Sequence, residues 1–201
     1  MAICRNCEGQ VPEGARYCPH CAQSQVDHLS SPLFIIDTVT GLFNSDFLQA
    51  LADQEANRAG RYHRPLSLLV CEVDHAEFIH HDLDVHRLTE LVRQLGKVVA
   101  EAVRDTDTVC AIAGQDTPRF GVVLPETNYE GALNAADKIR RMVASHDFEL
   151  GGEWSRLTMS CGTATLHDER MGREDLLAIA VQALEAGRPA GPNRTHAISP
   201  L

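Results

Sequence analysis

The feature that most restricts the fold is a predicted β-hairpin in the middle of the chain. Two apolar runs, Thr108 to Ala113 and Phe120 to Leu124, are separated by Gly114-Gln115-Asp116-Thr117-Pro118. Short apolar runs bounded by Gly, Asp and Pro are typical of buried strands joined by a turn. We therefore expect the hairpin to lie in a sheet whose other strands come from elsewhere in the chain.

A continuous apolar run over residues 65–74 ends on Glu72 and Asp74, which is typical of a central buried strand with acids at its C-terminal end. A further strand is predicted over Leu157–Leu166. Helices are predicted from Asn44 or Ser45 to about Ala59, from about Asp84 to Arg104, after Thr127 or Asn128, and from Glu174 to Leu184. In the second helix the apolar repeat runs from Val85 to Val103.

The helix after Asn128 has an apolar side and a basic side. We expect its apolar residues to face the core and its basic residues to face outward; the apolar set is Ala132, Ala135, Ile139 and Met142, and the basic set is Lys138, Arg140 and Arg141. Cys71, Cys110 and Cys161 all fall in predicted strands and are interpreted as small buried thiols.

The composition excludes several classes of protein. At 201 residues and 44% hydrophobic, the chain can bury one full core with a small appendage. A net charge of −10 gives no general attraction to nucleic acid or to an anionic membrane. No apolar run is long enough to span a bilayer, and no signal-peptide core follows the N-terminus. We expect a cytoplasmic protein whose cysteines are reduced or metal-bound.

Two Cys-x-x-Cys pairs stand near the N-terminus. Cys4, Cys7, Cys18 and Cys21 have the spacing that places four thiolates around a structural zinc ion. The apolar content is too low for this segment to fold alone, so the metal would supply most of its folding free energy. We predict a zinc ribbon over residues 1–24, a linker over 25–36 and the main domain over 37–201. A redox role for the pairs is disfavoured, because redox motifs use a single pair that opens a helix.

Several stretches resemble the GGDEF domain, the diguanylate cyclase family. They are Asp37-Thr-Val-Thr-Gly-Leu-Phe-Asn44, the hairpin, the strand ending at Leu166, and Gly191-Pro-Asn-Arg194. The resemblance covers residues 37–196 and implies an α/β fold with a central mixed sheet flanked by helices. The N-terminal segment resembles the short zinc ribbons found at the ends of many bacterial regulatory proteins.

Within that resemblance, the positions of the family's active site are altered. The first Asp of the metal-binding pair is Glu72, followed by Asp74, and the Lys that contacts phosphate is Arg188. At the hairpin tip Gly114 and Gln115 stand where Gly and an acid are expected, Asp116 belongs to an insertion, and Arg119 replaces a Glu. A metal ligand becomes an amide and an anion becomes a cation. We therefore expect a degenerate domain that is not an enzyme and holds no catalytic magnesium.

The base of the hairpin keeps a different family motif. Arg104 and Asp107 match the Arg-x-x-Asp site that binds the product, cyclic di-GMP, and Lys138 stands where a further basic contact is expected. In that site Arg pairs with phosphate and guanine, and Asp accepts from guanine N–H groups. Read without the family, Arg104 ends a helix favourably and Asp107 begins a turn.

Four interpretations follow. The first is a signalling protein that acts by binding cyclic di-GMP, a partner signalling protein, or both. The second is a protein–protein interaction scaffold without nucleotide binding. The third retains GTP binding or turnover through Glu72, Asp74 and Asp116. The fourth makes the ribbon a nucleic-acid module, which the acidic balance disfavours although Arg5, Arg16 and His20 are basic.

A histidine-rich segment replaces the guanine-reading loop of the family. His75, His80, His81 and His86, with Asp82 and Asp84, form a candidate metal site, but surface His and Asp in a loop are commoner than ligands. The segment is also compatible with a remodelled docking surface.

Overall fold

The structure is a computed structural model that describes residues 2–3, 10–11, 35–75, 83–112, 117–150, 152–166 and 176–198. The chain divides into two compact units, residues 1–34 and 35–201. In the first unit β1 (Ala2–Ile3) pairs antiparallel with β2 (Gln10–Val11). The predicted zinc ligands Cys4, Cys7, Cys18 and Cys21 lie outside the described residues, so the ribbon and its boundaries stay predictions.

The second unit is built on a mixed five-stranded sheet in the order β4-β5-β3-β8-β9. The strands are β3 (Leu66–Val73), β4 (Thr108–Ile112), β5 (Arg119–Pro125), β8 (Met159–Leu166) and β9 (Thr195–Ala197). Only β9 runs parallel to its neighbour, β8; the other pairings are antiparallel. The predicted hairpin, central strand and mixed sheet are confirmed.

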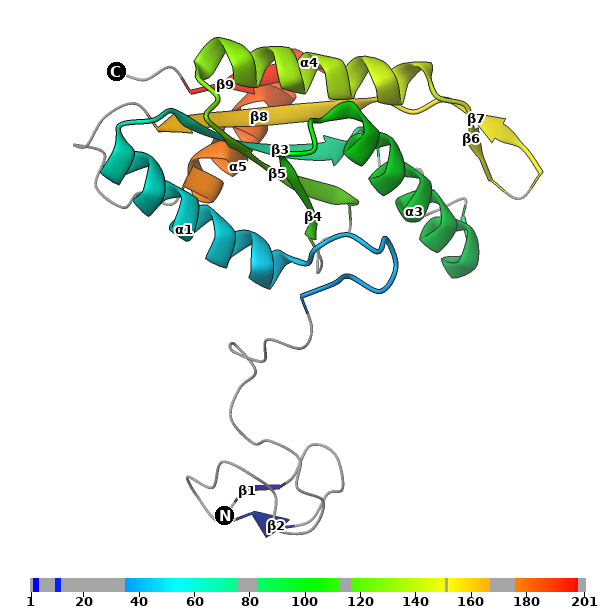
Figure 1. The fold of residues 1–201 in the computed structure, drawn as a ribbon. Coiled ribbons are helices and arrows are strands. Elements are labelled where there is room, and N and C mark those ends of the chain that lie inside the picture. The colour runs from blue at the N-terminus through cyan, green and yellow to red at the C-terminus, as the bar shows by residue number, and fades with distance from the viewer. Residues whose placement is uncertain are drawn as a thin grey trace. The chain divides into compact units, whose positions relative to one another are not determined.

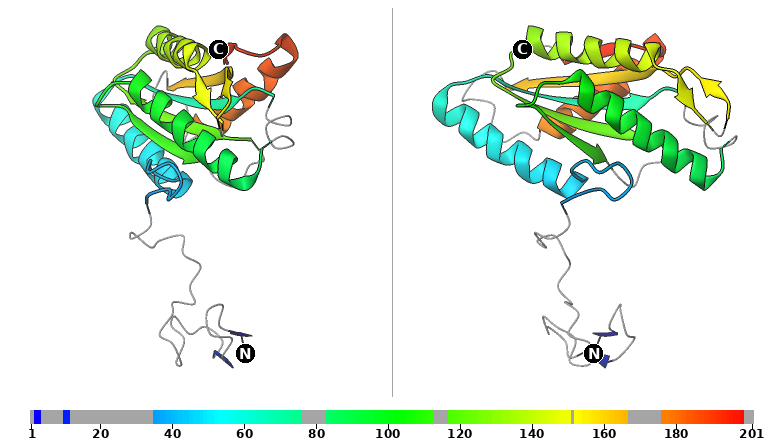
Figure 2. Two further views of the ribbon diagram at one scale, coloured as in Figure 1. Left: turned by 90° about the vertical axis from the view of Figure 1, so that its right-hand side faces the viewer. Right: turned by 45° about the vertical axis from the view of Figure 1, so that its right-hand side comes forward.

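In the part of the chain that the structure describes, four α-helices flank the sheet (Figures 1 and 2). They are α1 (Ser45–Tyr62), α3 (Val85–Ala102), α4 (Tyr129–Ser145) and α5 (Leu176–Gly187), and a short 3₁₀ turn, η1 (Arg188–Ala190), follows α5. The side chains of Asn44, Asp84 and Asn128 accept hydrogen bonds from the first turns of α1, α3 and α4. These caps satisfy backbone donors that a helix leaves unpaired and fix where each helix begins.

The core forms two layers, because β3 is buried on both faces. Leu69, Cys71 and Val73 pack with α3 and α4, and the alternate residues Leu66, Leu68 and Val70 pack with α1 and α5; both layers consist of buried hydrophobic residues from the sheet and its helices. Alternation of side chains along a strand produces this division. The run that was predicted as a central strand is therefore apolar throughout because neither face meets water.

Two glycines are required by the backbone. Gly41, in the loop before α1, has φ +73°, which L side chains rarely adopt. A Cβ on Gly162 in β8 would lie 2.1 Å from the carbonyl oxygen of Ala180 in α5. The helix can pack this closely on β8 only because residue 162 lacks a side chain.

The structure corrects several predicted details. The helices and strands begin or end one to three residues from most of the expected limits, as helix ends and strand ends commonly do. Val85 is 81% exposed instead of facing the core. It lies six residues before Leu91, about one and two-thirds turns, and so faces away from the buried line of α3.

A second correction concerns α4 and the segment after it. Arg140 was expected to face outward, but its side chain is only 18% exposed, whereas Lys138 and Arg141 are exposed as predicted. A small hairpin of β6 (Phe148–Glu149) and β7 (Trp154–Ser155) follows α4 and was not predicted. Two-residue strands carry too little alternation to give a sequence signal.

Candidate functional site

Glu72, near the end of β3, is bound by two arginines. It is 8% exposed, and Arg119 is its direct cross-strand neighbour in β5. The Nε of Arg119 donates to Oε2 of Glu72, while Nη2 of Arg188, in η1, donates to Oε1 at 2.7 Å. Each carboxylate oxygen thus already has a cationic donor, and the Arg119 side chain is itself only 12% exposed.

Asp74 accepts hydrogen bonds from three neutral donors. Its Oδ1 accepts from the hydroxyl of Ser160 at 2.7 Å, and its Oδ2 accepts from the hydroxyl of Thr158 at 2.6 Å and from the backbone N–H of Asn193 at 2.8 Å. Sequence reasoning missed these donors, although Thr158-x-Ser160 stands at the start of β8 beside the predicted acids. The three donors hold this carboxylate in one orientation.

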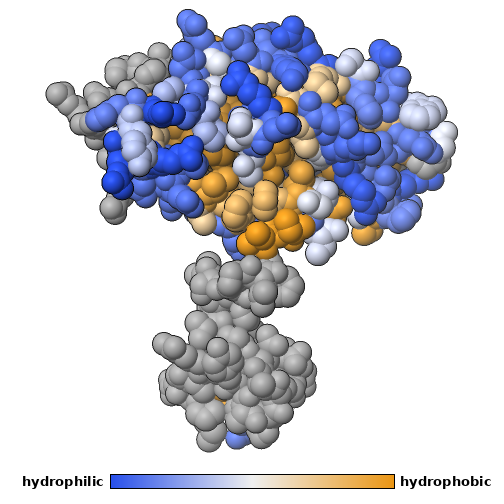
Figure 3. Space-filling model, viewed as in Figure 1, coloured by the Kyte–Doolittle hydropathy of each residue, from blue (hydrophilic) through white to orange (hydrophobic). Residues whose placement is uncertain are grey.

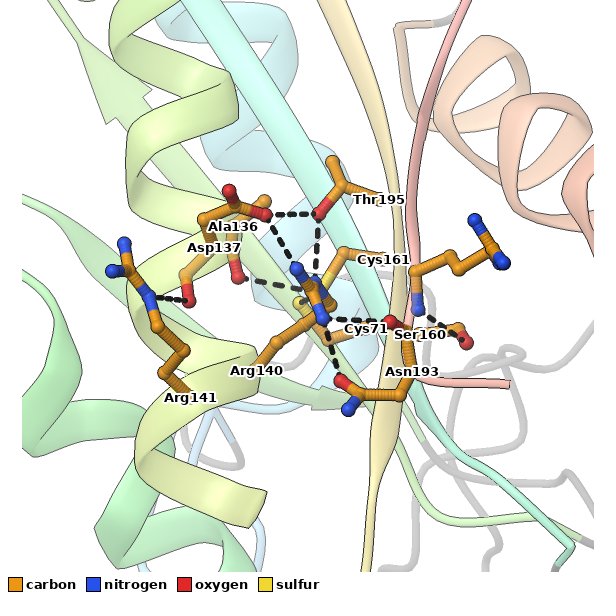
Figure 4. Close-up of polar contacts among 10 residues, drawn as sticks. Cys71, Ala136, Asp137, Arg140, Arg141, Ser160, Cys161, Asn193 and Thr195 are labelled. Carbon is orange, nitrogen blue, oxygen red and sulfur yellow. Dashed lines mark hydrogen bonds and ion pairs between the residues drawn. The ribbon is translucent and has the colours of Figure 1, made fainter. Parts of the chain in front are cut away.

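Asn193 links Asp74 to a polar network centred on Arg140; Figure 4 shows this network. Arg140 donates to the backbone oxygen of Asn193 at 2.6 Å, to Thr195 Oγ1 at 3.1 Å and to Asp137 Oδ1 at 2.8 Å. Asn193 has φ +57°, a conformation that Asn tolerates better than most residues. Arg140 therefore ties α4 to the segment whose N–H caps Asp74.

This network changes the acidity of Asp137. A hydrogen bond from Arg140, followed in importance by that from Thr195, lowers the pKa of the Asp137 carboxyl despite some burial. The site around Asp74 is thus supported by an ionised carboxylate and its partner cation on α4.

The strand thiols are buried, and two of them, those of Cys110 and Cys161, are poorly acidic. Cys71 and Cys161 are cross-strand partners with Sγ atoms 3.0 Å apart. The hydrogen bond to Cys71 and burial raise the pKa of Cys161, and burial raises the pKa of Cys110 to about 12. Protonated thiols are weak nucleophiles. The prediction that these cysteines are buried is confirmed.

The Arg104–Asp107 turn has an open cation and a partly unsatisfied acid. Asp107 Oδ2 accepts from the backbone N–H of Arg104 at 2.9 Å, and the N–H of Asp107 donates back to the oxygen of Arg104 at 2.9 Å. Among the described residues, Oδ1 of Asp107 has no hydrogen-bond partner and the Arg104 side chain, which is exposed, makes no ion pair. The turn expected from sequence is confirmed; the Arg104 side chain is exposed, whereas the unpaired Oδ1 of Asp107 is buried.

Other predicted site residues fall where nothing can be described. Gly114, Gln115 and Asp116 at the hairpin tip, and His80, His81 and Asp82 of the histidine-rich loop, lie outside the described residues. Among the residues that are described, no group of three or more His, Cys, Asp or Glu is placed to hold a metal ion. No described helix combines the length and apolarity needed to cross a bilayer.

Comparison with known proteins agrees with this fold. The profile of the family described as "Diguanylate cyclase, GGDEF domain" matches residues 34–194. The response regulator PleD of Caulobacter vibrioides is 28% identical over 173 residues, which are 85% of this chain and 37% of PleD. The chain thus spans little more than a third of that relative.

Solved structures share the fold. The active GGEEF domain of a diguanylate cyclase from Vibrio cholerae has a TM-score of 0.70 at 25% identity, covering 80% of this chain and 99% of that one. The GGDEF domain of DgcB from Caulobacter crescentus in complex with c-di-GMP has a TM-score of 0.74 at 19% identity, covering 81% and 92%. The diguanylate cyclase SiaD of Pseudomonas aeruginosa, in complex with its activator SiaC, has a TM-score of 0.74 at 20% identity, covering 82% and 62%.

The fold is a mixed sheet flanked by helices, with two acids at the end of its central strand. The family profile matches most of the chain, residues 34–194. The chain belongs to the GGDEF domain family, and its homologues include diguanylate cyclases.

Proposed function

We propose that this GGDEF domain is non-catalytic and acts by binding. The observation that carries the proposal is the state of Glu72, whose two oxygens are each bound by an arginine. A magnesium ion at this position would have to displace at least one guanidinium from a carboxylate that is 8% exposed. The pair with Arg119 is the buried one, since the Arg119 side chain is 12% exposed and that of Arg188 is 56% exposed. Breaking a buried ion pair costs several kcal/mol, and magnesium also demands near-ideal octahedral geometry.

The neighbouring acid fits magnesium no better. Both oxygens of Asp74 already accept hydrogen bonds from this chain. Gln115 stands where the family resemblance implies an acid, and an amide oxygen carries no charge to balance the metal. The donor set therefore does not suit the metal ion that diguanylate cyclase chemistry requires, and no catalytic step is assigned to it.

The binding activity is proposed to be recognition of cyclic di-GMP at Arg104 and Asp107. Arg104 is exposed and makes no ion pair with the described residues, so its fork of N–H donors is available to phosphate or to guanine. Asp107 is held by the turn through one oxygen only. Lys138 is exposed on α4, where a further cation would contact the ligand.

Titration calorimetry with cyclic di-GMP tests this proposal. We expect binding by the wild-type protein and a loss of about 10- to 100-fold in affinity for Arg104→Ala, since a hydrogen bond to a charged group is worth about 1.5–3 kcal/mol. Arg87→Ala, an exposed arginine on α3, is the matched control and should bind normally. No heat for any of the three proteins would contradict ligand binding and leave the interaction scaffold.

Incubation with GTP and magnesium tests the proposal that the domain is non-catalytic. We expect no dinucleotide by chromatography, and a product that disappears in Glu72→Gln would show that the domain is an enzyme.

The N-terminal cysteines are proposed to hold structural zinc. Their doubled Cys-x-x-Cys spacing supports four-thiolate coordination. The purified protein should contain about one zinc per chain, and Cys18→Ser should lose it; equal metal content in both would remove the ribbon.

A further inference from the structure

The β6–β7 hairpin carries the most exposed large aromatic side chain that the structure describes. Trp154 is the single tryptophan of the chain and is 69% exposed. The hairpin extends from the domain beyond the ends of α3 and α4 (Figures 1 and 2). A large apolar side chain in water is unfavourable, and tryptophan is enriched among the residues that dominate binding at protein interfaces.

The hairpin is anchored to the domain through β6, and Trp154 lies on the strand paired with it. Phe148 is fully buried and Leu150 is 9% exposed. The side-chain amide of Gln94, in α3, donates to the backbone oxygen of Glu149 at 3.0 Å and accepts from its N–H at 3.2 Å. The N–H of Leu150 donates to the oxygen of Glu153 at 2.8 Å. A backbone already held in place leaves less conformational entropy to lose on binding.

Tyr62, another exposed aromatic residue, has a cation beside its ring, which Trp154 lacks among the described residues. Tyr62 is 58% exposed, and the guanidinium of Arg61 lies 5.6 Å from the centre of its ring. No cation among the described residues lies over the ring of Trp154, although indole attracts cations more strongly than phenol does. The chain therefore satisfies one aromatic face itself and leaves the better one open.

Two glutamates adjoin Trp154, and the nearest cation in the chain, Arg156, is paired with Asp147. Glu149 is the direct cross-strand partner of Trp154, so the two side chains share a face of the hairpin. Glu153 precedes Trp154, and both glutamates are exposed and unpaired among the described residues. The end of the domain that carries this hairpin is mainly hydrophilic (Figure 3). An uncovered indole beside two free carboxylates suits a cation, not an apolar surface.

The geometry points to a docking site for a partner protein, made by Trp154, Glu149 and Glu153, that receives an arginine or lysine of the partner. The cation would lie over the indole while its N–H groups donate to the carboxylates. This inference rests on the proposed function only in that the domain acts by binding. It names a surface separate from the Arg104–Asp107 turn and specifies the chemistry of the protein partner.

Trp154 is its own reporter, because the chain's one indole gives a single N–H signal in a ¹H–¹⁵N spectrum. The full chain is titrated to about 5 mM with a glycine–serine peptide that carries two arginines, and with the same peptide carrying citrulline in place of both. We expect the indole signal to shift with the arginine peptide and binding to be at least fivefold weaker with citrulline. Glu149→Gln/Glu153→Gln should weaken arginine binding about threefold or more, and Tyr62→Phe should not.

An indole signal that does not move, or that moves equally with both peptides, would overturn the inference. Acrylamide quenching of the free protein checks that the site is open. Quenching far below that of free N-acetyltryptophanamide would mean that residues 1–34 or a second copy already cover Trp154, which also contradicts it. The peptide titration repeated on Arg104→Ala should be unchanged, so failure of the cyclic di-GMP proposal and failure of this one remain distinguishable.

Discussion

The end of β3 and the turn before β4 both carry carboxylates, but their hydrogen-bond partners differ. At Glu72 and Asp74 every side-chain oxygen accepts a hydrogen bond from the protein. At the turn, Asp107 uses one oxygen locally, and the Arg104 side chain makes no ion pair with the described residues. The carboxylates of the first region are stabilised by contacts within the domain, whereas the second region exposes a cation that makes no ion pair with the described residues.

The comparison shows why similar residues have different uses. A buried charge that is fully paired can bind a ligand only by losing its present partner, which costs more than an exposed charge pays to leave water. In this chain, Glu72 and Asp74, at which the family resemblance implies metal binding, are paired, and the Arg104 side chain, at which it implies product binding, is exposed. The largest effect is expected when an arginine is replaced by alanine in each of the two regions.

Arg119→Ala should lower the free energy of unfolding by about 2–4 kcal/mol, because it leaves a nearly buried Glu72 with one cation instead of two. Arg104→Ala should change it by no more than about 0.5 kcal/mol, since that side chain is exposed. Urea unfolding followed by circular dichroism measures both. Equal effects would break the comparison, whereas Glu72→Met/Arg119→Met should recover much of the lost stability, because it removes both charges together.

Asp74→Asn tests the contribution of the donors to the second carboxylate at the end of β3. The substitution exchanges one accepting oxygen for an NH₂ group, so at least one of the donors from Thr158, Ser160 and Asn193 loses its acceptor. We expect a loss of about 1–3 kcal/mol in the free energy of unfolding. Asp105→Asn is the control, because Asp105 is exposed and bonds no described residue; similar losses in the two variants would contradict the role of these donors.

The smallest expected effect is a pH dependence that originates behind Asp74. Hydrogen bonds from Arg140 and Thr195 lower the pKa of Asp137 in the folded protein. A lowered folded pKa gives stabilisation that is fully present above the unfolded value, near about 4, and is lost as the pH falls through the folded pKa.

Asp137→Asn should therefore be less stable than the wild type at pH 7, and the difference should shrink as the pH falls below about 4. Urea midpoints at several pH values measure it. A difference that stays constant down to the lowest pH at which the protein folds would show that Asp137 does not act through its charge. Because Asp137 is 45% exposed, solvent screening keeps the effect modest.

The hydrophobic pattern predicted most of the fold. The continuous run of β3 indicated a strand covered on both faces, and the repeat in α3 indicated a helix packed against it. Asn44 and Asn128 marked helix starts because their side chains can cap the first turn. These features depend on residues close together in the chain, so a sequence can reveal them.

The contacts of the candidate site were much harder to predict. Arg119 and Glu72 are 47 positions apart, and Arg188 and Glu72 are 116 apart. Their pairing depends on the register between β3 and β5 and on where the turn after α5 falls. For the same reason Arg140 was placed on the wrong side of α4, since Asp137 is local but Asn193 and Thr195 lie on a distant strand segment.

The sequence by itself determined the α/β architecture, the regions in which the helices begin and the family, because each of these follows from local patterns of residue type. Only the tertiary structure decided that Glu72 is paired while Arg104 is open, and that Trp154 is exposed beside Glu149. Whether a charge or a ring is satisfied depends on which distant residues the sheet and helices bring within hydrogen-bonding distance of it.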